Sequence, residues 1–212
     1  MSSMGRATAR APMETPTALK APLFRSLVEQ LDGAGRRHIL DLGAASTPML
    51  SLLGRSRCRV EIADLASDDG IGRINVEEAT REELAAMAEA LLPAHRGDDS
   101  DDDALDIVFC WDLPNYLKPK PLSALMSAIA ARARRGALVH ALIVYSERTM
   151  PARPGRFVPT EDVMLVNRSG STAEIAAPRY SPDDLRRIMS GFAIDRVMLL
   201  SNGMQEFLFR LQ

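Results

Sequence analysis

The sequence predicts an α/β fold: a doubly wound, mostly parallel sheet of about seven strands that ends in an antiparallel hairpin. Two observations predict it. Apolar runs of strand length alternate with segments whose apolar residues recur at helical spacing, which is typical of a parallel sheet covered by helices on both faces. The last two runs, 192–200 and 206–211, are separated by Asn202-Gly203, a turn typical of hairpins. Because a short turn makes its two strands antiparallel, at least one strand must run against the others.

Composition narrows the class of protein. The 212 residues are 46% hydrophobic and 25% charged, the balance of one globular domain. A net charge of −2 indicates no nucleic-acid partner, and no apolar run approaches the roughly 18 residues that span a bilayer. The two cysteines form no disulfide framework or paired metal-ligand motif, so we predict no metal site and a cytoplasmic location.

The chain divides into a tail and a domain. Residues 1–17 are rich in Ala, Ser, Pro and Arg, which predicts a disordered tail, and 18–212 form a single domain. An organelle transit peptide is the alternative for the tail, but no amphipathic face supports it.

The stretch 38–53 organises the rest. Ile39–Leu42 is a short apolar run typical of a buried parallel strand, Gly43 begins a turn, and Thr47 and Pro48 are suited to the N-cap and first position of a helix. Ligands of open α/β sheets bind at the carboxyl ends of the strands beside such turns. We therefore expect one wall of a small-molecule site here.

The remaining elements follow from the same signals. Expected strands lie at 59–65, 73–76, 104–111 and 137–145, and shorter β-like pieces lie at 163–166 and 172–175. Expected helices lie at 19–31, 80–92 and 122–135. Gly136 is the expected cap of the last of these, and a further helix starts at Ser181. The acidic run 97–103 is typical of a solvated loop, and its acids lack the spacing of a calcium loop.

Two carboxylates close the first two strands. Asp41 precedes Gly43 by two residues, and Asp64 follows 23 residues after Asp41. In doubly wound folds an acid about 20 residues beyond the glycine turn accepts hydrogen bonds from ribose hydroxyls, so Asp64 is a candidate for that role. The alternative is that Asp64 only caps the following turn. The second and third glycines of the dinucleotide pattern are absent, which argues against NAD and FAD.

At this point the chain resembles class I S-adenosylmethionine-dependent methyltransferases, a family with a Rossmann-like sheet. Asp41-Leu42-Gly43-Ala44-Ala45-Ser46 is similar to their first motif, and 104–112 is similar to their fourth-strand motif. The resemblance implies S-adenosylmethionine as cofactor and a last strand that inserts antiparallel. The cofactor-binding residues that it implies are Asp41, Gly43, Ala45, Asp64, Leu65, Cys110 and Trp111.

Asp112, Asn115 and Tyr116 are the predicted catalytic, substrate-side residues, since they follow a strand's carboxyl end. A carboxylate there could orient or deprotonate a nucleophile. The alternatives are packing for Trp111 and Tyr116, a turn for Asn115, a buried hydrophobe for Cys110 and a core histidine for His140. Glu147 follows the next strand and could reach the same pocket.

Three functional hypotheses remain. The first is methyl transfer to a small-molecule or protein acceptor; the second is a methyltransferase-fold binding or scaffold protein without activity, which Ala45 in place of a glycine motivates. The third, a nicotinamide-dependent oxidoreductase, lacks the glycines that such cofactors need. Segment 150–156, with Arg153 and Arg156, is either a substrate flap or a solvent loop, and the oligomeric state is open.

Overall fold

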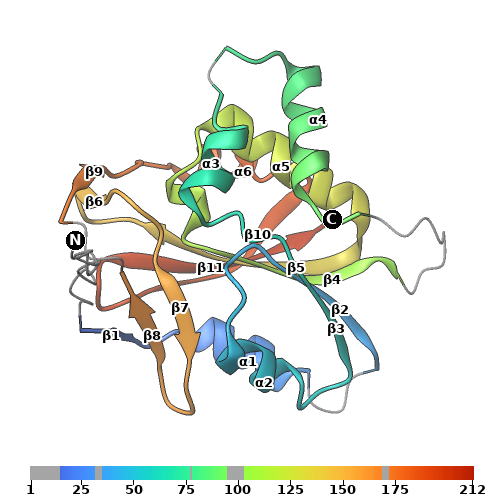
Figure 1. The fold of residues 1–212 in the computed structure, drawn as a ribbon, viewed down its shortest axis with the longest axis vertical. Coiled ribbons are helices and arrows are strands. Elements are labelled where there is room, and N and C mark those ends of the chain that lie inside the picture. Colours follow the sequence, from blue (N-terminus) through green and yellow to red (C-terminus); the bar gives the residue numbers. More distant parts are fainter. Residues whose placement is uncertain (1–14, 32–34, 77, 95–102, 169–171) are drawn as a thin grey trace, which may run out of the picture.

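The computed structural model describes residues 15–31, 35–76, 78–94, 103–168 and 172–212. At its centre lies a sheet of six strands in the order β10-β11-β5-β4-β2-β3 (Figure 1). These strands are β2 (Arg37–Asp41), β3 (Cys58–Ile62), β4 (Leu105–Trp111), β5 (Ala133–Val144), β10 (Phe192–Leu199) and β11 (Met204–Leu211). The pairs among β2, β3, β4 and β5 are parallel, and β11 runs antiparallel to both of its neighbours. The doubly wound, mostly parallel fold and the reversed last strand are confirmed, with six central strands instead of seven.

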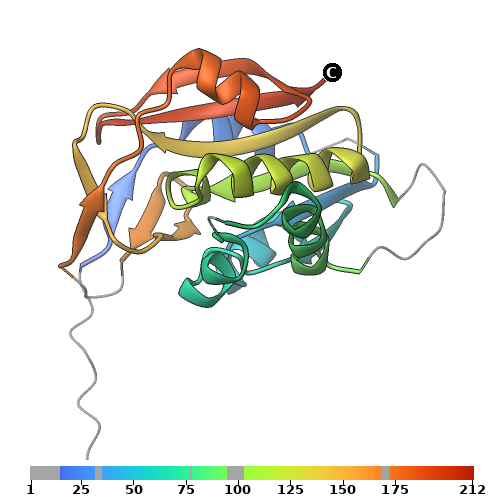
Figure 2. The same ribbon diagram turned by 90° about the horizontal axis from the view of Figure 1, so that it is seen from above.

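Two layers cover the sheet (Figures 1 and 2). On one face lie α1 (Pro22–Glu29), α2 (Thr47–Leu53) and a small sheet of β1 (Thr17–Leu19), β8 (Met164–Asn167) and β7 (Arg156–Pro159). On the other lie α3 (Asp68–Ile74), α4 (Arg81–Leu91), α5 (Pro119–Arg132) and α6 (Pro182–Ile188). A short 3₁₀ turn, η2 (Leu113–Asn115), follows β4, and β6 (Thr149–Pro151) pairs with β9 (Glu174–Ala176). Each layer buries its own apolar cluster against the sheet. None of the helices described is long and apolar enough to cross a membrane.

The expected strand at 73–76 is wrong, because Arg73 and Ile74 end α3 and Asn75 is its C-cap. Ser67 accepts a hydrogen bond from the backbone N–H of Gly70 and so starts a helix instead of a turn. A side chain at position 70 would meet the carbonyl oxygen of Leu65 at 2.8 Å, so Gly70 permits this close approach. Ile74, which was expected in a strand, lies at the end of this helix and is buried in the core.

Other element boundaries differ by a few residues. The expected helix at 19–31 begins only at Pro22, because Leu19 pairs with β8. The long helix ends at Arg132, so Gly136 is not its cap but lies within β5 with φ +84°. Ser46, not Thr47, caps α2. The capping residues expected at Thr80 and Ser181 are confirmed.

The tail and acidic-loop predictions fall largely outside the described residues, which exclude 1–14 and 95–102. The expected boundary between tail and domain, after residue 17, falls inside β1. Asp103 closes the acidic run and pairs with Arg59 of β3.

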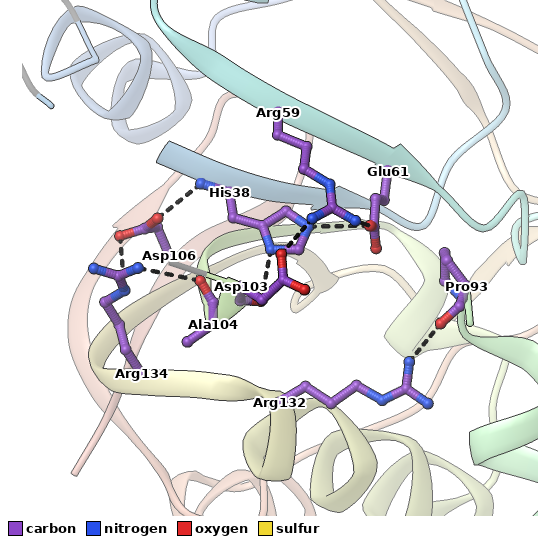
Figure 3. A network of polar contacts seen from close by, with 9 residues as sticks. All are labelled: His38, Arg59, Glu61, Pro93, Asp103, Ala104, Asp106, Arg132 and Arg134. Carbon is purple, nitrogen blue, oxygen red and sulfur yellow. Dashed lines mark hydrogen bonds and ion pairs between the residues drawn. The ribbon is translucent and has the colours of Figure 1, made fainter. Parts of the chain in front are cut away.

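A charged cluster ties together the amino ends of the central strands (Figure 3). The carboxylate of Asp106 accepts hydrogen bonds from the backbone of His38 at 2.7 Å and from Arg37 at 2.9 Å, and it pairs with Arg134 at 3.2 Å. Arg59 pairs with both Glu61 and Asp103. These contacts cross β2, β3, β4 and β5, so they fix the amino edge of the sheet and leave its carboxyl edge for a site.

Glu206 of β11 is fully buried and caps a helix from another part of the chain. Its two carboxylate oxygens accept hydrogen bonds from the backbone N–H groups of Leu23 (2.9 Å) and Phe24 (2.7 Å) in the first turn of α1. One of them also lies 3.0 Å from Nε2 of His140, which is itself fully buried. A negative charge at a helix N-terminus is stabilised by the unpaired N–H groups there. His140 lies in the core, as expected, but only its Nε2 is satisfied: Nδ1 has no hydrogen-bond partner among the described residues.

We predict that Glu206→Ala lowers the free energy of unfolding by about 3–5 kcal/mol, because it leaves two helix N–H groups and His140 without their buried partner. Urea unfolding followed by circular dichroism measures this, with Glu174→Ala on an exposed strand as the control. A loss for Glu206→Ala no larger than for the control would contradict the capping role.

Candidate functional site

A cavity of about 260 Å³ opens at the carboxyl ends of β2, β3 and β4. Its lining includes Asp41, Gly43, Ser46, Asp64, Ser67 and Trp111, and its outer wall is the segment 154–157 that leads into β7. We call it the first cavity. The two carboxylates predicted to meet at neighbouring strand ends therefore line the same space.

The indole of Trp111 joins the ends of β4 and β2. Its Nε1 donates a hydrogen bond of 2.6 Å to Oδ1 of Asp41, which also accepts one of 2.8 Å from the backbone N–H of Gly43. A Cβ on Gly43 would lie 2.7 Å from Nε1 of the indole, so the close approach requires glycine. Both bonds use Oδ1, which leaves Oδ2 of Asp41 for a ligand.

Aromatic rings surround this indole. Phe157 of β7 stacks on Trp111 with ring centroids 5.3 Å apart and planes 7° apart, and Phe109 stacks on Trp111 at 5.4 Å. Phe24 of α1 completes the group at 5.5 Å. The stack buries Trp111 to 3% exposure and keeps the floor of the first cavity apolar.

Backbone strain is concentrated in this cavity. Among the described residues, the non-glycine residues with positive φ are Asp64 (46°) and Trp111 (51°), and both line it. The strand pairing of β4 with β5 shifts register between Phe109 and Trp111, as at a β-bulge. Left-handed conformations of bulky residues and bulges gather at functional sites, where they aim a side chain.

The environments of the two carboxylates differ. Burial raises the pKa of Asp41, the hydrogen bonds from Trp111 and Gly43 oppose this, and the charge of Asp64 raises it further. The side chain of Asp64 is exposed at the cavity. The first carboxylate is thus held by the protein, whereas the second faces the space that a ligand would fill.

Three other predicted cofactor residues lie away from the first cavity. Leu65 and Cys110 are buried in the apolar cluster beneath the other helical layer, and burial raises the pKa of the Cys110 thiol to about 12. Ala45 is exposed on the turn. The backbone N–H of Leu65 donates a hydrogen bond to the carbonyl of Leu42 and so joins the chain after β3 to the end of β2.

Two of the predicted catalytic residues, Asp112 and Tyr116, form hydrogen bonds to the backbone of the loop 153–155. Oδ2 of Asp112 accepts a hydrogen bond of 2.9 Å from the backbone N–H of Gly155. The hydroxyl of Tyr116 lies 2.8 Å from the carbonyl of Arg153. The amide of Asn115 donates to two carbonyls and accepts from the backbone of Val144, so all its hydrogens are used within the protein. Catalysis by these three residues stays a prediction.

One carboxylate oxygen of Asp112, Oδ1, has no hydrogen-bond partner among the described residues. Asp112 is 1% exposed. Burial raises its pKa to about 7, against the opposing effects of the Gly155 N–H and the Arg168 charge. A carboxyl group with a pKa near neutrality is suited to proton transfer at that pH.

Further residues, beyond the predicted cofactor-binding and catalytic ones, line the two sides of the site. Segment 150–156 was expected as a flap or a solvent loop, and 154–156 wall the first cavity together with Phe157. Arg168 was not predicted, because nothing in its local sequence indicates a functional role. It lies near Asp112 because β8, which precedes it, pairs with β7. Gly155, which stands between Pro154 and Arg156, was a signal in the sequence for a close backbone approach.

Comparison with family models finds no match for the sequence, and comparison with curated proteins finds none either. Solved structures give matches. A glycopeptide N-methyltransferase complexed with S-adenosylmethionine has 18% identity, covering 95% of this chain and 100% of that chain, with a TM-score of 0.49. Magnesium protoporphyrin IX methyltransferase from Synechocystis has 18% identity, 91% and 79% coverage and a TM-score of 0.48. The pyocyanin biosynthetic protein PhzM has 14% identity and a TM-score of 0.48; the match covers 89% of this chain and 54% of that one. Function has to be inferred from the residues of the chain itself.

We predict that Gly43→Ala destabilises the protein by about 1–3 kcal/mol, because the new methyl group displaces the indole from Asp41. Trp111 is the sole tryptophan, so its fluorescence reports the displacement directly. Gly72→Ala is the matched control: nothing lies within 4 Å of its Cβ position in α3, and helix propensity favours a gain of up to about 1 kcal/mol. Unchanged fluorescence in Gly43→Ala would contradict the packing described.

A second prediction concerns pH. Because the pKa of Asp112 is raised to about 7 in the folded state, the native chain holds a proton that the unfolded chain releases above about pH 4. The free energy of unfolding therefore falls as pH rises from about 4 to 7, and Asp112→Asn reduces this fall. Asp195→Asn, whose parent carboxyl has a lowered pKa, is the control and leaves the fall intact. Equal pH slopes in Asp112→Asn and the parent protein, measured by urea unfolding, would refute the assignment.

Proposed function

We propose that the chain is a methyltransferase that binds S-adenosylmethionine in the first cavity and transfers its methyl group to a small-molecule or protein acceptor. The observation that carries the proposal is the meeting of Asp41 and Asp64 in one cavity, at the carboxyl ends of two adjacent parallel strands. In doubly wound folds this is where nucleosides bind.

The residues of the first cavity fit the nucleoside part of this cofactor. The exposed carboxylate of Asp64 can accept hydrogen bonds from both ribose hydroxyls. The aromatic rings of Trp111 and Phe157 and the side chain of Met49 supply apolar surface for the base. The volume, about 260 Å³, is slightly below the roughly 300 Å³ at which ligand pockets usually begin, so an entire cofactor would extend past segment 154–157 toward solvent.

Bound S-adenosylmethionine would supply an electrophilic methyl group, and the chain would contribute position, exclusion of water and proton transfer. The stack of Phe157 on Trp111 closes one side of the cavity to solvent. Asp112 lies one residue beyond Trp111, and its raised pKa lets it take up a proton from an acceptor at neutral pH. Alignment of the reactants contributes most of the acceleration in such a transfer, so few acid–base groups are needed.

A second candidate function is ligand binding without methyl transfer. One observation favours it: the indole of Trp111 covers Gly43, one of the residues expected to bind the cofactor, and donates a hydrogen bond to Oδ1 of Asp41. In that case the first cavity would take a nucleoside and leave no room at Gly43 for the reacting sulfonium arm.

Calorimetry with S-adenosylmethionine, its demethylated product, NAD and adenosine tests the proposal. We predict that the first two bind and that Asp64→Ala weakens both at least tenfold, because the ribose loses its acceptor. Asp183→Ala, an exposed carboxylate on α6, is the control with unchanged affinity.

The outcomes separate the candidates. Absence of binding by both sulfur ligands refutes the methyltransferase, and binding of NAD alone favours the oxidoreductase hypothesis. Tight binding of adenosine combined with no binding of S-adenosylmethionine supports the second candidate. An Asp64→Ala variant of unchanged affinity refutes the placement of the ribose. A cytoplasmic location is part of the same proposal.

A further inference from the structure

A second cavity, of about 190 Å³, lies on the other side of the Asp112–Gly155 contact from the first. Strands β1, β6 and β8, the loop after β4 and the turn between β10 and β11 surround it. Its charged lining residues are Asp112, Glu147 and Arg168, and its apolar surface includes Leu19, Met150 and Met204.

Two buried polar atoms of residues that line this cavity have no hydrogen-bond partner among the residues described. Oδ1 of Asp112 and one terminal nitrogen of Arg168, Nη1, form no hydrogen bond within the described part of the chain. The guanidinium lies near enough to lower the pKa of Asp112, and it is also hydrogen-bonded to the side chain of Tyr116. Buried polar atoms are almost always hydrogen-bonded, and an unpartnered buried charge is costly.

We propose that the second cavity binds a small zwitterionic molecule of the amino-acid type. Its carboxylate would accept hydrogen bonds from Arg168, and its ammonium group would donate to Oδ1 of Asp112. One molecule would thus satisfy both unpartnered atoms at once.

Charge and volume define the ligand further. Glu147 stands exposed at the cavity and adds a second carboxylate, which disfavours ligands with two negative charges such as dicarboxylates. The apolar surface of Leu19, Met150 and Met204 is suited to an uncharged side chain. A volume of about 190 Å³ corresponds to several water molecules at about 30 Å³ each, which limits the ligand to a small molecule.

The second cavity lies next to the first. Asp112 contributes to the second cavity, and its hydrogen-bond partner Gly155 contributes to the first, so one layer of residues separates the two. The claim that a zwitterion binds here does not depend on the proposed function.

Calorimetry on the full chain, without S-adenosylmethionine, tests the binding claim. The probes are the L-amino acids alanine, serine, threonine, valine, leucine and methionine, with glutamate as the dicarboxylate. We expect at least one neutral amino acid to bind. The amine that lacks its carboxylate and the acid that lacks its ammonium group should bind at least tenfold more weakly, and glutamate should not bind.

Variants identify the site. Arg168→Gln and Asp112→Asn should each weaken the amino acid at least tenfold, and Arg168→Lys should restore part of the affinity. Arg179→Gln, an exposed arginine outside the lining, is the control. Arg168 is only partly buried, so its variants keep the test valid if Asp112→Asn fails to fold.

Binding of none of the neutral amino acids means that water alone fills the cavity and overturns the proposal. Equal binding of the acid without its ammonium group also overturns it. Because no cofactor is added, failure here leaves the binding of S-adenosylmethionine untouched, and failure of the cofactor to bind leaves this result standing.

Discussion

The hydrogen bond between the indole of Trp111 and the carboxylate of Asp41 is the contact on which the carboxyl edge of the sheet depends. It joins the ends of β4 and β2, which are neighbours in the sheet but 70 residues apart in the chain. It requires a left-handed backbone at Trp111 and the absence of a side chain at Gly43. Charge-assisted hydrogen bonds of this length are stronger than neutral ones, so the contact can hold a conformation that the backbone alone disfavours.

The two edges of the sheet have different roles. At the amino edge, the charged groups around Asp106 and Arg59 are paired with one another across four strands (Figure 3). At the carboxyl edge, Asp64 is exposed to a cavity, and buried atoms of Asp112 and Arg168 have no protein partner. Paired charges stabilise an edge, whereas unpartnered ones are groups that a ligand can satisfy.

Local signals in the sequence were sufficient for the frame of the site. The run Ile39–Leu42 forms β2 as expected, and the spacing from Asp41 to Asp64 brings both carboxylates to one cavity, because parallel neighbours end at the same edge. The turn at Asn202-Gly203 likewise specified the hairpin, and Gly203 has the positive φ that such a turn needs.

What the sequence could not specify depends on contacts between distant segments. The direction of the Trp111 side chain follows from a bulge in β4 and from Phe157 stacking on it, and neither has a local signal. Arg168 reaches the second cavity through the pairing of β8 with β7 and β1. At α3, the Ser67 cap starts a helix that reaches Ile74, so the strand expected at 73–76 does not form.

The most direct test of the central claim is the NMR signal of the sole indole N–H in the chain, that of Trp111. If a nucleoside cofactor binds against the pair formed by Trp111 and Asp41, saturating S-adenosylhomocysteine will shift this resonance, and Asp41→Asn will shift it in the unliganded protein. A resonance that neither the ligand nor the Asp41→Asn substitution moves would contradict both the hydrogen bond and the placement of the cofactor beside it.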